Sequence, residues 1–437
     1  MNRILTDDLA KHVGSQITIA GWLHKKRLLG GLNFITLRDR RGIAQSLVDD
    51  KAELEKLRGL HIGTVMSLTG TVVADERAPG GAELHDVTVE IITPVTEEPP
   101  IEIDKPISHK PDHLDTLFDY RVLNIRNPQE QKIFKIRNTI VRAIRDYLYE
   151  HDFTEIDTPK LLGKPTEGGA EVFMLDYFGQ QACLAQSPQL YKQIMVGAFE
   201  RVFEIGHAYR AEPSATTRHM TELTMLDIEM GFVDSHDEVM DLVGDVTRHT
   251  LEVAYNKHAQ DLRSLNAPEL ALPTDGKVPR YTVTEIHELY SKSTQTDTMN
   301  EKDLTPDEER WIADHARKQH GSDLVYATNF PREAGKFYHK FYDDGTVAWA
   351  DLLFRGVEIA TVPLRENNHD KMVEQMSAAG LDVSSEGFKY YLQAFKFGLP
   401  QHGGCGFGID RLVQKTIGLG NVKEATLFPR DINRLTP

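Results

Sequence analysis

Between residues 16 and 96, short apolar runs alternate with turn signals. QITIAGWLH, LNFITLRD, GIAQSLVD, TVMSLTGTVVAD and LHDVTVEIITPV each have the length and composition of a β-strand, and glycine and proline clusters separate them. Between the third and fourth runs, DKAELEKLRG has the leucine and charge spacing of a short helix. Five strands with one helix after the third predict an OB-fold β-barrel, a fold that commonly binds oligonucleotides.

A proline-rich stretch separates this pattern from a second one. From Glu97 to Asp112 the chain reads EEPPIEIDKPISHKPD, which predicts a stiff linker. An Asn-Pro-Gln-Glu helix start at residue 127 follows, and apolar residues then recur at every third or fourth position from Ile133 to Leu148. We therefore expect a helix over 128–150 that ends at His151.

The remaining strand signals do not alternate regularly with helices. Because no βαβ fingerprint is present, we expect an α+β domain built on an antiparallel sheet flanked by helices. The predicted strands are FTEIDTPKLL and residues 201–212, 221–232, 346–361 and 404–412. The predicted organisation is an OB-fold domain over 1–100, a hinge over 101–125 and a second domain over 126–437, with an insertion over 255–325.

Composition narrows the class of protein. At 437 residues the chain is long enough for two or three domains, and 40% apolar and 27% charged residues are typical of globular proteins. We find no signal-peptide or membrane-spanning stretch, and Cys183 and Cys405 are the only cysteines, so we expect a cytoplasmic protein with reduced thiols. The net charge of -16 argues against indiscriminate binding to nucleic acid.

A local basic cluster departs from that acidic balance. It fits either a phosphate-binding patch on the barrel or a solvated charged hairpin. Within seventeen residues it contains six cations, Lys25, Lys26, Arg27, Arg38, Arg40 and Arg41.

Three short segments carry residues suited to phosphate or amino-acid chemistry. The segment from Tyr209 to Glu229 contains arginines, which can form bidentate hydrogen bonds with phosphate. It also contains carboxylates, which can bind an amine or Mg²⁺. Gly404 to Leu412 places Arg411 near a helix start behind glycines that permit close backbone approach. Gln186 to Lys192 presents polar groups and one lysine from a turn. Alone, each also fits a surface hairpin, a tight turn or an ordinary helix N-terminus.

The order of these segments resembles the class II aminoacyl-tRNA synthetases, most closely the archaeal-type aspartyl branch. A helix leading to a TP strand is followed by TEGGAE, QSPQLYK, RAE with RH, and GxGxDR. The resemblance spans the chain from GWLHKKRLLGGLNFITLRDRRG to LFPRDINRLTP. It implies an enzyme that activates L-aspartate with ATP and transfers it to the 3′ end of tRNA.

For ATP, the resemblance implies contacts from motifs 2 and 3. Arg210 and Arg411 match the two arginines that hold ATP and, with Glu358, are the expected catalytic residues. Asp351, Glu358 and Thr361 match the magnesium site. The implied ATP-binding set is Arg210, Glu212, Arg218, His219, Met220, Glu358, Gly406, Phe407, Gly408, Ile409 and Arg411.

For aspartate, the resemblance implies a pocket with two cations. Lys192 suits the side-chain carboxylate, because a neutral asparagine amide would offer it no counter-charge. Arg365 matches a second clamp on that carboxylate, and Glu167 in the TEGG loop matches the residue that recognises the amino group. The implied set is Glu167, Gln189, Lys192, Arg210, Asp227, Thr361 and Arg365.

The resemblance also implies partners. Anticodon bases would stack on Phe34 while Lys25 and its neighbours meet phosphate. Relatives that charge both aspartate and asparagine tRNAs tend to carry the residues that His24 and Pro79 match, so we expect relaxed tRNA choice and a link to an amidotransferase that converts the mischarged product. Residues 128–150 and the TP strand match the dimer interface, which implies a homodimer.

One stretch departs from the family. Between Glu358 and Arg365 this chain reads IATVPL, where relatives carry a segment such as SSGGQ or SGS. Thr361 keeps a hydroxyl, but Val362 and Pro363 add bulk, and a proline lacks an amide donor. Two alternatives therefore stay open: a paralogue or resistant second copy with an altered amino-acid pocket, and an inactive tRNA-binding protein.

Overall fold

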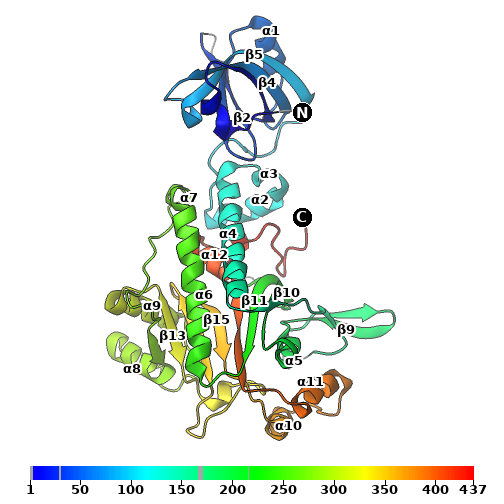
Figure 1. Cartoon of the computed structure of the whole chain (residues 1–437), viewed down its shortest axis with the longest axis vertical. Helices are drawn as coiled ribbons and strands as arrows, with labels where there is room; N and C mark the ends of the chain where they lie inside the picture. The colour runs from blue at the N-terminus through cyan, green and yellow to red at the C-terminus, as the bar shows by residue number, and fades with distance from the viewer. Residues whose placement is uncertain (1–2, 29–30, 166–170, 215) are drawn as a thin grey trace. The chain divides into compact units, whose positions relative to one another are not determined.

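In the computed structural model the chain folds into two compact units (Figure 1). The structure describes residues 3–28, 31–165, 171–214 and 216–437. One unit runs to Lys132 and includes Pro437, and the other spans residues 133–436. The predicted hinge over 101–125 falls inside the first unit by this division, so the domain boundaries stay a prediction.

The first unit contains the predicted OB-fold barrel. Within the described residues its strands pair in the closed order β1-β2-β3-β5-β4, and their inward residues form one apolar core. Asp50 caps helix α1 by accepting hydrogen bonds from the amides of Ala52 and Glu53. The elements are η1 Thr6–His12, β1 Gln16–Leu28, β2 Asn33–Arg38, β3 Ile43–Leu47, α1 Lys51–Arg58, β4 Val65–Ala74, η2 Pro79–Gly81, β5 Ala82–Thr93, η3 Pro111–His113, α2 Leu114–Asp119 and α3 Arg121–Asn124.

The second unit is organised around a large mixed sheet. Among the described residues its strand order is β12-β13-β14-β15-β16-β11-β10-β6, antiparallel except for the parallel pair at each edge. The elements are α4 Pro128–Glu150, β6 Thr154–Glu155, β7 Leu161–Leu162, β8 Met174–Tyr177, β9 Gln180–Leu184, α5 Gln189–Phe199, β10 Arg201–Tyr209, β11 Glu222–Gly231, α6 His236–Lys257, α7 Ala259–Ser264, β12 Arg280–Thr282, α8 Val283–Thr294, α9 Pro306–His320, β13 Leu324–Thr328, η4 Arg332–Ala334, β14 Trp349–Phe354, β15 Val357–Pro363, α10 His369–Ala378, α11 Glu386–Lys396, β16 His402–Gly408, α12 Ile409–Ile417 and η5 Val422–Ala425.

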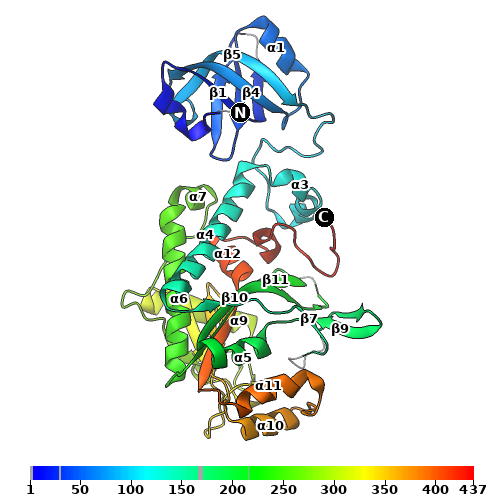
Figure 2. The same ribbon diagram turned by 45° about the vertical axis from the view of Figure 1, so that its right-hand side comes forward.

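The two faces of this sheet differ in polarity. On β11, Leu226 and Ile228 join the apolar core, whereas Asp227 and Glu229 point to the opposite face, because successive strand side chains alternate. Helices α4 and α6 lie side by side in both views of the unit and contribute to the apolar core (Figures 1 and 2). On β11 the two carboxylates therefore lie on the face turned away from that core.

Four predicted strands end earlier or divide. The strand predicted over 201–212 stops at Tyr209, so Arg210 and Glu212 follow it in a loop. The strand predicted over 346–361 is the pair β14 and β15, because Arg355 and Gly356 turn the chain with φ of 51° and 74°. The strand predicted over 404–412 gives way to helix α12 at Ile409, and FTEIDTPKLL contains only the short strands β6 and β7.

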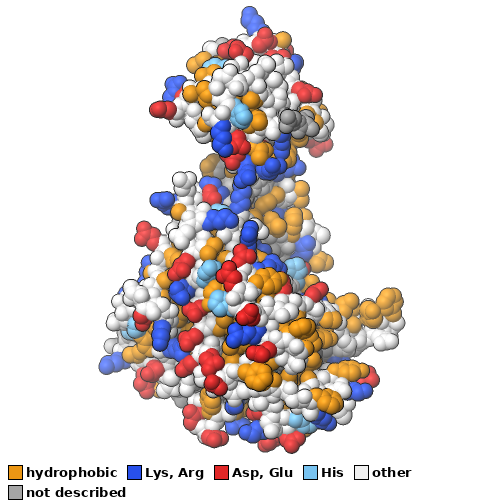
Figure 3. Space-filling model, viewed as in Figure 1, with side chains coloured by type: hydrophobic (Ala, Val, Ile, Leu, Met, Phe, Trp, Pro, Cys, Tyr) orange, Lys and Arg blue, Asp and Glu red, His pale blue; other side chains and the backbone are white. Residues whose placement is uncertain are grey.

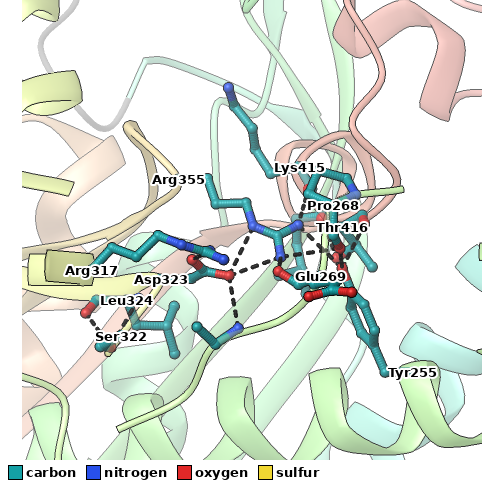
Figure 4. Close-up of polar contacts among 12 residues, drawn as sticks. Tyr255, Pro268, Glu269, Arg317, Ser322, Asp323, Leu324, Arg355, Lys415 and Thr416 are labelled. Atoms are coloured by element: carbon teal, nitrogen blue, oxygen red, sulfur yellow. Dashed lines mark hydrogen bonds and ion pairs between the residues drawn. The ribbon is translucent and has the colours of Figure 1, made fainter. Parts of the chain in front are cut away.

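A polar network fixes the turn between β14 and β15 (Figure 4). The guanidinium of Arg355 donates to Asp323 Oδ2 at 2.8 and 3.0 Å and to the carbonyl of Lys415 on α12 at 2.9 Å. Arg317 on α9 also pairs with Asp323, and Arg355 reaches the hydroxyl of Tyr255 at 3.1 Å. The strands that carry Asp351 and Glu358 are thus tied to three neighbouring elements.

The segment predicted as an insertion has regular structure. Thr282 and Thr305 begin α8 and α9 with complete capping boxes, and Gly321 ends α9 in the left-handed conformation. Strands β12 and β13 extend one edge of the sheet. Among the described residues, no helix is both long and apolar enough to cross a membrane.

Candidate active site

A cavity of about 320 Å³ lies on the polar face of the sheet of the second unit. Residues from both predicted binding sets line it together, although they are far apart in sequence. Those residues are Gln189, Arg210, Glu212, Arg218, His219, Met220, Asp227, Glu358, Thr361, Arg365, Gly406, Gly408 and Arg411.

A β-bulge turns Glu358 toward this cavity. Leu353 pairs with Glu358 and Leu352 with Ala360, so Ile359 is an extra residue in β15. In a regular strand Glu358 and Thr361 would point to opposite faces, yet Thr361 Oγ1 donates a hydrogen bond to Glu358 Oε1 at 2.9 Å. The bulge therefore places the carboxylate and the hydroxyl side by side.

One arginine contacts this carboxylate and a second lines the same cavity. Arg411 Nη1 donates to the carbonyl of Glu358 at 2.8 Å and lies 3.3 Å from its Oε2. Arg210 lines the same cavity, and within the described chain its guanidinium has no hydrogen-bond or ion-pair partner. Its charge is therefore available to an anionic ligand, and arginine is well shaped for phosphate oxygens.

A third arginine is held by the segment that the sequence predicts as an insertion. Arg218 Nη1 donates to Glu309 Oε2 at 2.7 Å, and Glu309 lies on helix α9. Burial raises the pKa of Glu309, and the nearby charge of Glu358 adds to this, although Arg218 acts in the opposite direction. Helix α9 thus holds Arg218, which lines the cavity, from behind.

The pKa values of the two carboxylates in the expected metal site are shifted in opposite directions. Burial and then the charge of Glu358 raise the pKa of Asp351 well above its ordinary value. Burial also acts to raise the pKa of Glu358, but Arg411, Thr361 and Arg210 outweigh it and leave that pKa lowered. Among the described residues, no group of three or more His, Cys, Asp or Glu is arranged to hold a metal. Two carboxylates and a hydroxyl nevertheless suit Mg²⁺, which takes one or two carboxylates together with substrate phosphates.

The two predicted aspartate-binding cations are not equally accessible. Lys192 does not line the cavity, and its Nζ donates to Asp227 Oδ1 at 2.9 Å and to the carbonyl of Cys405 at 2.8 Å, with Glu229 Oε2 at 3.6 Å. It lies behind Asp227, which does line the cavity. Its direct contact with substrate stays a prediction.

Arg365 keeps part of its guanidinium for a ligand. Its Nε and Nη2 donate to Glu229 at 2.9 and 3.1 Å, and Nη2 also donates to Gln189 Oε1 at 3.0 Å. Among the described residues its Nη1 has no acceptor, and Arg365 lines the cavity. Burial acts to raise the pKa of Glu229, but Arg365 and Lys192 outweigh it and hold that pKa below its ordinary value.

Some predicted residues do not present a side chain to the cavity. Phe407 and Ile409 are buried in the apolar core, so their predicted part in ATP binding would come from the backbone. Asp351 does not line the cavity and accepts a hydrogen bond from Trp349 Nε1 at 2.7 Å. Glu167 lies outside the described residues.

One wall of the cavity was not predicted from the sequence. It consists of Lys336, Tyr338, His339 and Trp349. A concentration of aromatic residues and histidine in KFYHKFY was the available signal.

The unusual proline lies against this wall. Pro363 lines the cavity and pairs with Trp349 of β14. In the described chain, β15 pairs with β16 at Ala360 and Thr361, and contact resumes at the Leu364–Gly403 bridge. Pro363 lies between these two contacts, where the ladder to β16 requires no amide donor. A proline is therefore tolerated at this position in the centre of the sheet.

The barrel uses part of its basic cluster internally. Lys26 Nζ donates to carbonyls at the end of α1, and Arg38 stacks on Trp22 with 4.8 Å to the ring centroid. Lys25 and Arg27 are exposed, and Arg27 pairs across the strands with Phe34, which is half-buried. Lys26 and Arg38 are thus engaged within the barrel, whereas Lys25 and Arg27 are exposed, and phosphate binding by the cluster stays a prediction.

The other two predicted anticodon residues lie on irregular backbone. His24 is the extra residue of a bulge in β1, and burial followed by the charge of Arg38 lowers its pKa. Pro79 is exposed in the connection between β4 and β5, one of the connections that OB-folds use for ligands.

Comparison with known proteins agrees with both units. Residues 113–432 match the family model described as tRNA synthetases class II (D, K and N), and residues 17–93 match the OB-fold nucleic acid binding domain. In solved structures, asparaginyl-tRNA synthetase from Pyrococcus horikoshii complexed with asparaginyl-adenylate has a TM-score of 0.91 at 29% identity, covering 100% of both chains. The fold by itself therefore does not separate aspartate from asparagine.

Curated relatives match over the full chain. Aspartate--tRNA(Asp/Asn) ligase of Thermus thermophilus is 39% identical over 436 residues, which cover 100% of each chain. Aspartate--tRNA(Asp) ligase of Pyrococcus abyssi is 38% identical and covers 97% of each. With the family match over most of its length, the chain belongs to the class II tRNA synthetases of the D, K and N group.

Proposed function

We propose that this protein is an aspartate--tRNA ligase, which activates L-aspartate with ATP and transfers it to the 3′ end of tRNA. The observation that carries the proposal is Arg365. Its Nη1, which has no acceptor among the described residues, offers a charge-assisted hydrogen-bond donor to the substrate side chain in the same cavity that Arg210 and Arg411 line, while Glu229 holds the rest of the guanidinium. Relatives named aspartate--tRNA ligase over the full chain length support the same substrate.

The proposed reaction needs no nucleophile from the protein. The α-carboxylate of aspartate attacks the α-phosphorus of ATP, pyrophosphate leaves, and a ribose hydroxyl at the tRNA end then takes the aspartyl group with release of AMP. Arg210 and Arg411 would stabilise the negative charge that develops at phosphorus, because both half-buried guanidinium groups line the cavity that would hold the phosphates. Glu358 would keep Arg411 in place through the contacts at 2.8 and 3.3 Å.

Asp351, Glu358 and Thr361 would hold Mg²⁺ beside the phosphates. The ion would neutralise phosphate charge during the first step. Because burial and Glu358 raise the pKa of Asp351, a cation bound there would also relieve the repulsion between the two carboxylates.

We also propose relaxed tRNA choice, with His24 and Pro79 as its determinants. Exposed Lys25 and half-buried Phe34 on the same barrel suit phosphate contact and base stacking. Purified aspartate and asparagine tRNAs should both accept aspartate, with rates within about tenfold of each other, since a tenfold difference is only about 1.4 kcal/mol. Charging of the aspartate tRNA alone would contradict this part of the proposal, and charging of neither would contradict the function itself.

Two partners follow from this proposal. Relaxed charging requires an amidotransferase to convert aspartate on the asparagine tRNA. A second copy of the chain would form a homodimer, for which α4 and the TP strand are the proposed interface. Buried free cysteines suit a reducing compartment, and we propose the cytoplasm.

Exposed apolar residues on the second unit suit burial in such a dimer. Leu161, Met174, Tyr177 and Phe178 are exposed, and Figure 3 shows hydrophobic side chains gathered over the β8–β9 hairpin. Gel filtration or light scattering would report the oligomeric state.

An altered amino-acid specificity is the second candidate function. Pro363 lines the cavity and lies in register with Trp349, so the departure from the family falls within the pocket wall. An inactive tRNA-binding protein is less well supported, because Arg210, Glu358 and Arg411 converge on one cavity.

A further inference from the structure

His339 is a buried imidazole on the unpredicted wall of the cavity. It follows Tyr338 and forms an antiparallel bridge with Arg365. Side chains of directly opposed residues lie on the same face and within reach of one another. His339 therefore stands beside the cation proposed to bind the aspartate side chain.

The hydrogen bonding of His339 determines which nitrogen carries the proton. The backbone N–H of Lys336 donates to His339 Nδ1 at 3.2 Å, so Nδ1 is an acceptor. Burial and then the charge of Arg365 lower the pKa of His339 well below its ordinary value, which keeps the ring neutral. In a neutral imidazole with Nδ1 as acceptor, Nε2 bears the hydrogen.

The resulting Nε2–H donor has no acceptor within the part of the chain that the structure describes. Nη1 of Arg365, across the bridge, also lacks an acceptor among those residues. Two donors carried by buried residues thus line one cavity, and the described residues supply neither donor with an acceptor.

The geometry points to His339 as a binding and specificity-determining residue, whose Nε2–H donates, together with Nη1 of Arg365, to the side-chain carboxylate of the amino-acid substrate. This role rests on the proposed function. A carboxylate can accept from both groups, since each of its oxygens is an acceptor.

The same pair of donors would reject a carboxamide. Where the two donors engage separate oxygens of the carboxylate, the NH₂ group of asparagine would replace one oxygen and face a donor with no acceptor opposite. A site built to hydrogen-bond one group discriminates strongly against an analogue that leaves buried polar atoms unpaired. His339 cannot adapt by moving its proton, because Nδ1 is committed to the amide of Lys336.

Two substitutions separate binding from selectivity. His339→Leu keeps much of the volume but removes the donor, and should raise KM for aspartate about tenfold or more while KM for ATP changes less than about twofold. His339→Gln keeps a donor and can also turn an acceptor oxygen toward the substrate. It should retain most aspartate activity but lower the aspartate-over-asparagine ratio of kcat/KM about tenfold or more.

The assay is amino-acid-dependent ATP–pyrophosphate exchange on the full chain, with exposed His320→Ala as control. An unchanged aspartate KM in His339→Leu, or an unchanged ratio in His339→Gln, would overturn the assignment. An equal rise in the KM for aspartate and the KM for ATP would also overturn the assignment, because it would indicate a structural role. If wild type activates another amino acid, the proposed function fails, and the variants are then measured with that amino acid.

A spectroscopic measurement does not depend on the leucine variant folding. In protein labelled with ¹⁵N-histidine, the resonance missing from His339→Gln belongs to His339. Saturating aspartate should shift its Nε2 signal, whereas an unshifted signal would contradict direct contact.

Discussion

Arg210→Ala is expected to lower aspartate-dependent ATP–pyrophosphate exchange by about a thousandfold or more, the range seen when a preorganised charge at a transition state is removed. Arg210 follows β10 in the loop that begins the cavity wall, and its guanidinium has no partner among the described residues. The substitution should therefore change the free energy of unfolding little. The effect should fall on ATP use rather than on folding.

The measurement is initial exchange rate at saturating aspartate and ATP, beside thermal denaturation of the same preparation. Arg263→Ala is the matched control, because Arg263 is an exposed arginine on α7 outside the cavity. Exchange by Arg210→Ala within a few-fold of wild type would refute the assignment.

Arg365→Ala is expected to impair both stability and aspartate binding. It leaves Glu229 fully buried without its two hydrogen bonds from Arg365, and breaking a buried ion pair on one side costs roughly 3–5 kcal/mol of unfolding free energy. It also removes the proposed clamp, so KM for aspartate should rise at least about a hundredfold. Urea denaturation at neutral pH measures the first effect.

A double substitution distinguishes the two effects. Arg365→Met with Glu229→Gln removes both charges, so it should recover much of the lost stability. It should not recover aspartate binding, because no cation is restored. Recovery of both properties would show that Arg365 acts on substrate only through the fold.

Local signals in the sequence predicted several elements well. The barrel strands follow from apolar runs bounded by glycine and proline, and α4 follows from a cap, a first-turn proline and a regular apolar spacing. Equivalent signals were present at Thr282 and Thr305, whose capping boxes begin α8 and α9. The segment predicted as an insertion could therefore have been divided into helices from its sequence.

Other features depend on tertiary structure. Arg355 adopts a positive φ that a non-glycine residue rarely takes, so one predicted strand became two. The bulge at Ile359 reverses the face of Glu358, which simple alternation places incorrectly. Most residues that the family resemblance assigned to the site line one cavity in the structure. The resemblance did not identify the wall that contains His339, because the role of His339 depends on which of its ring nitrogens already accepts a hydrogen bond.

The most direct test of the central claim is ATP–pyrophosphate exchange by the wild-type chain with each of aspartate, asparagine and lysine as the amino acid. The paired donors of the pocket predict exchange with aspartate at a kcat/KM at least about a hundredfold above that with asparagine, and none with lysine, whose cation would face Arg365. Preferential exchange with asparagine or lysine, or no exchange with any of the three, would contradict the account.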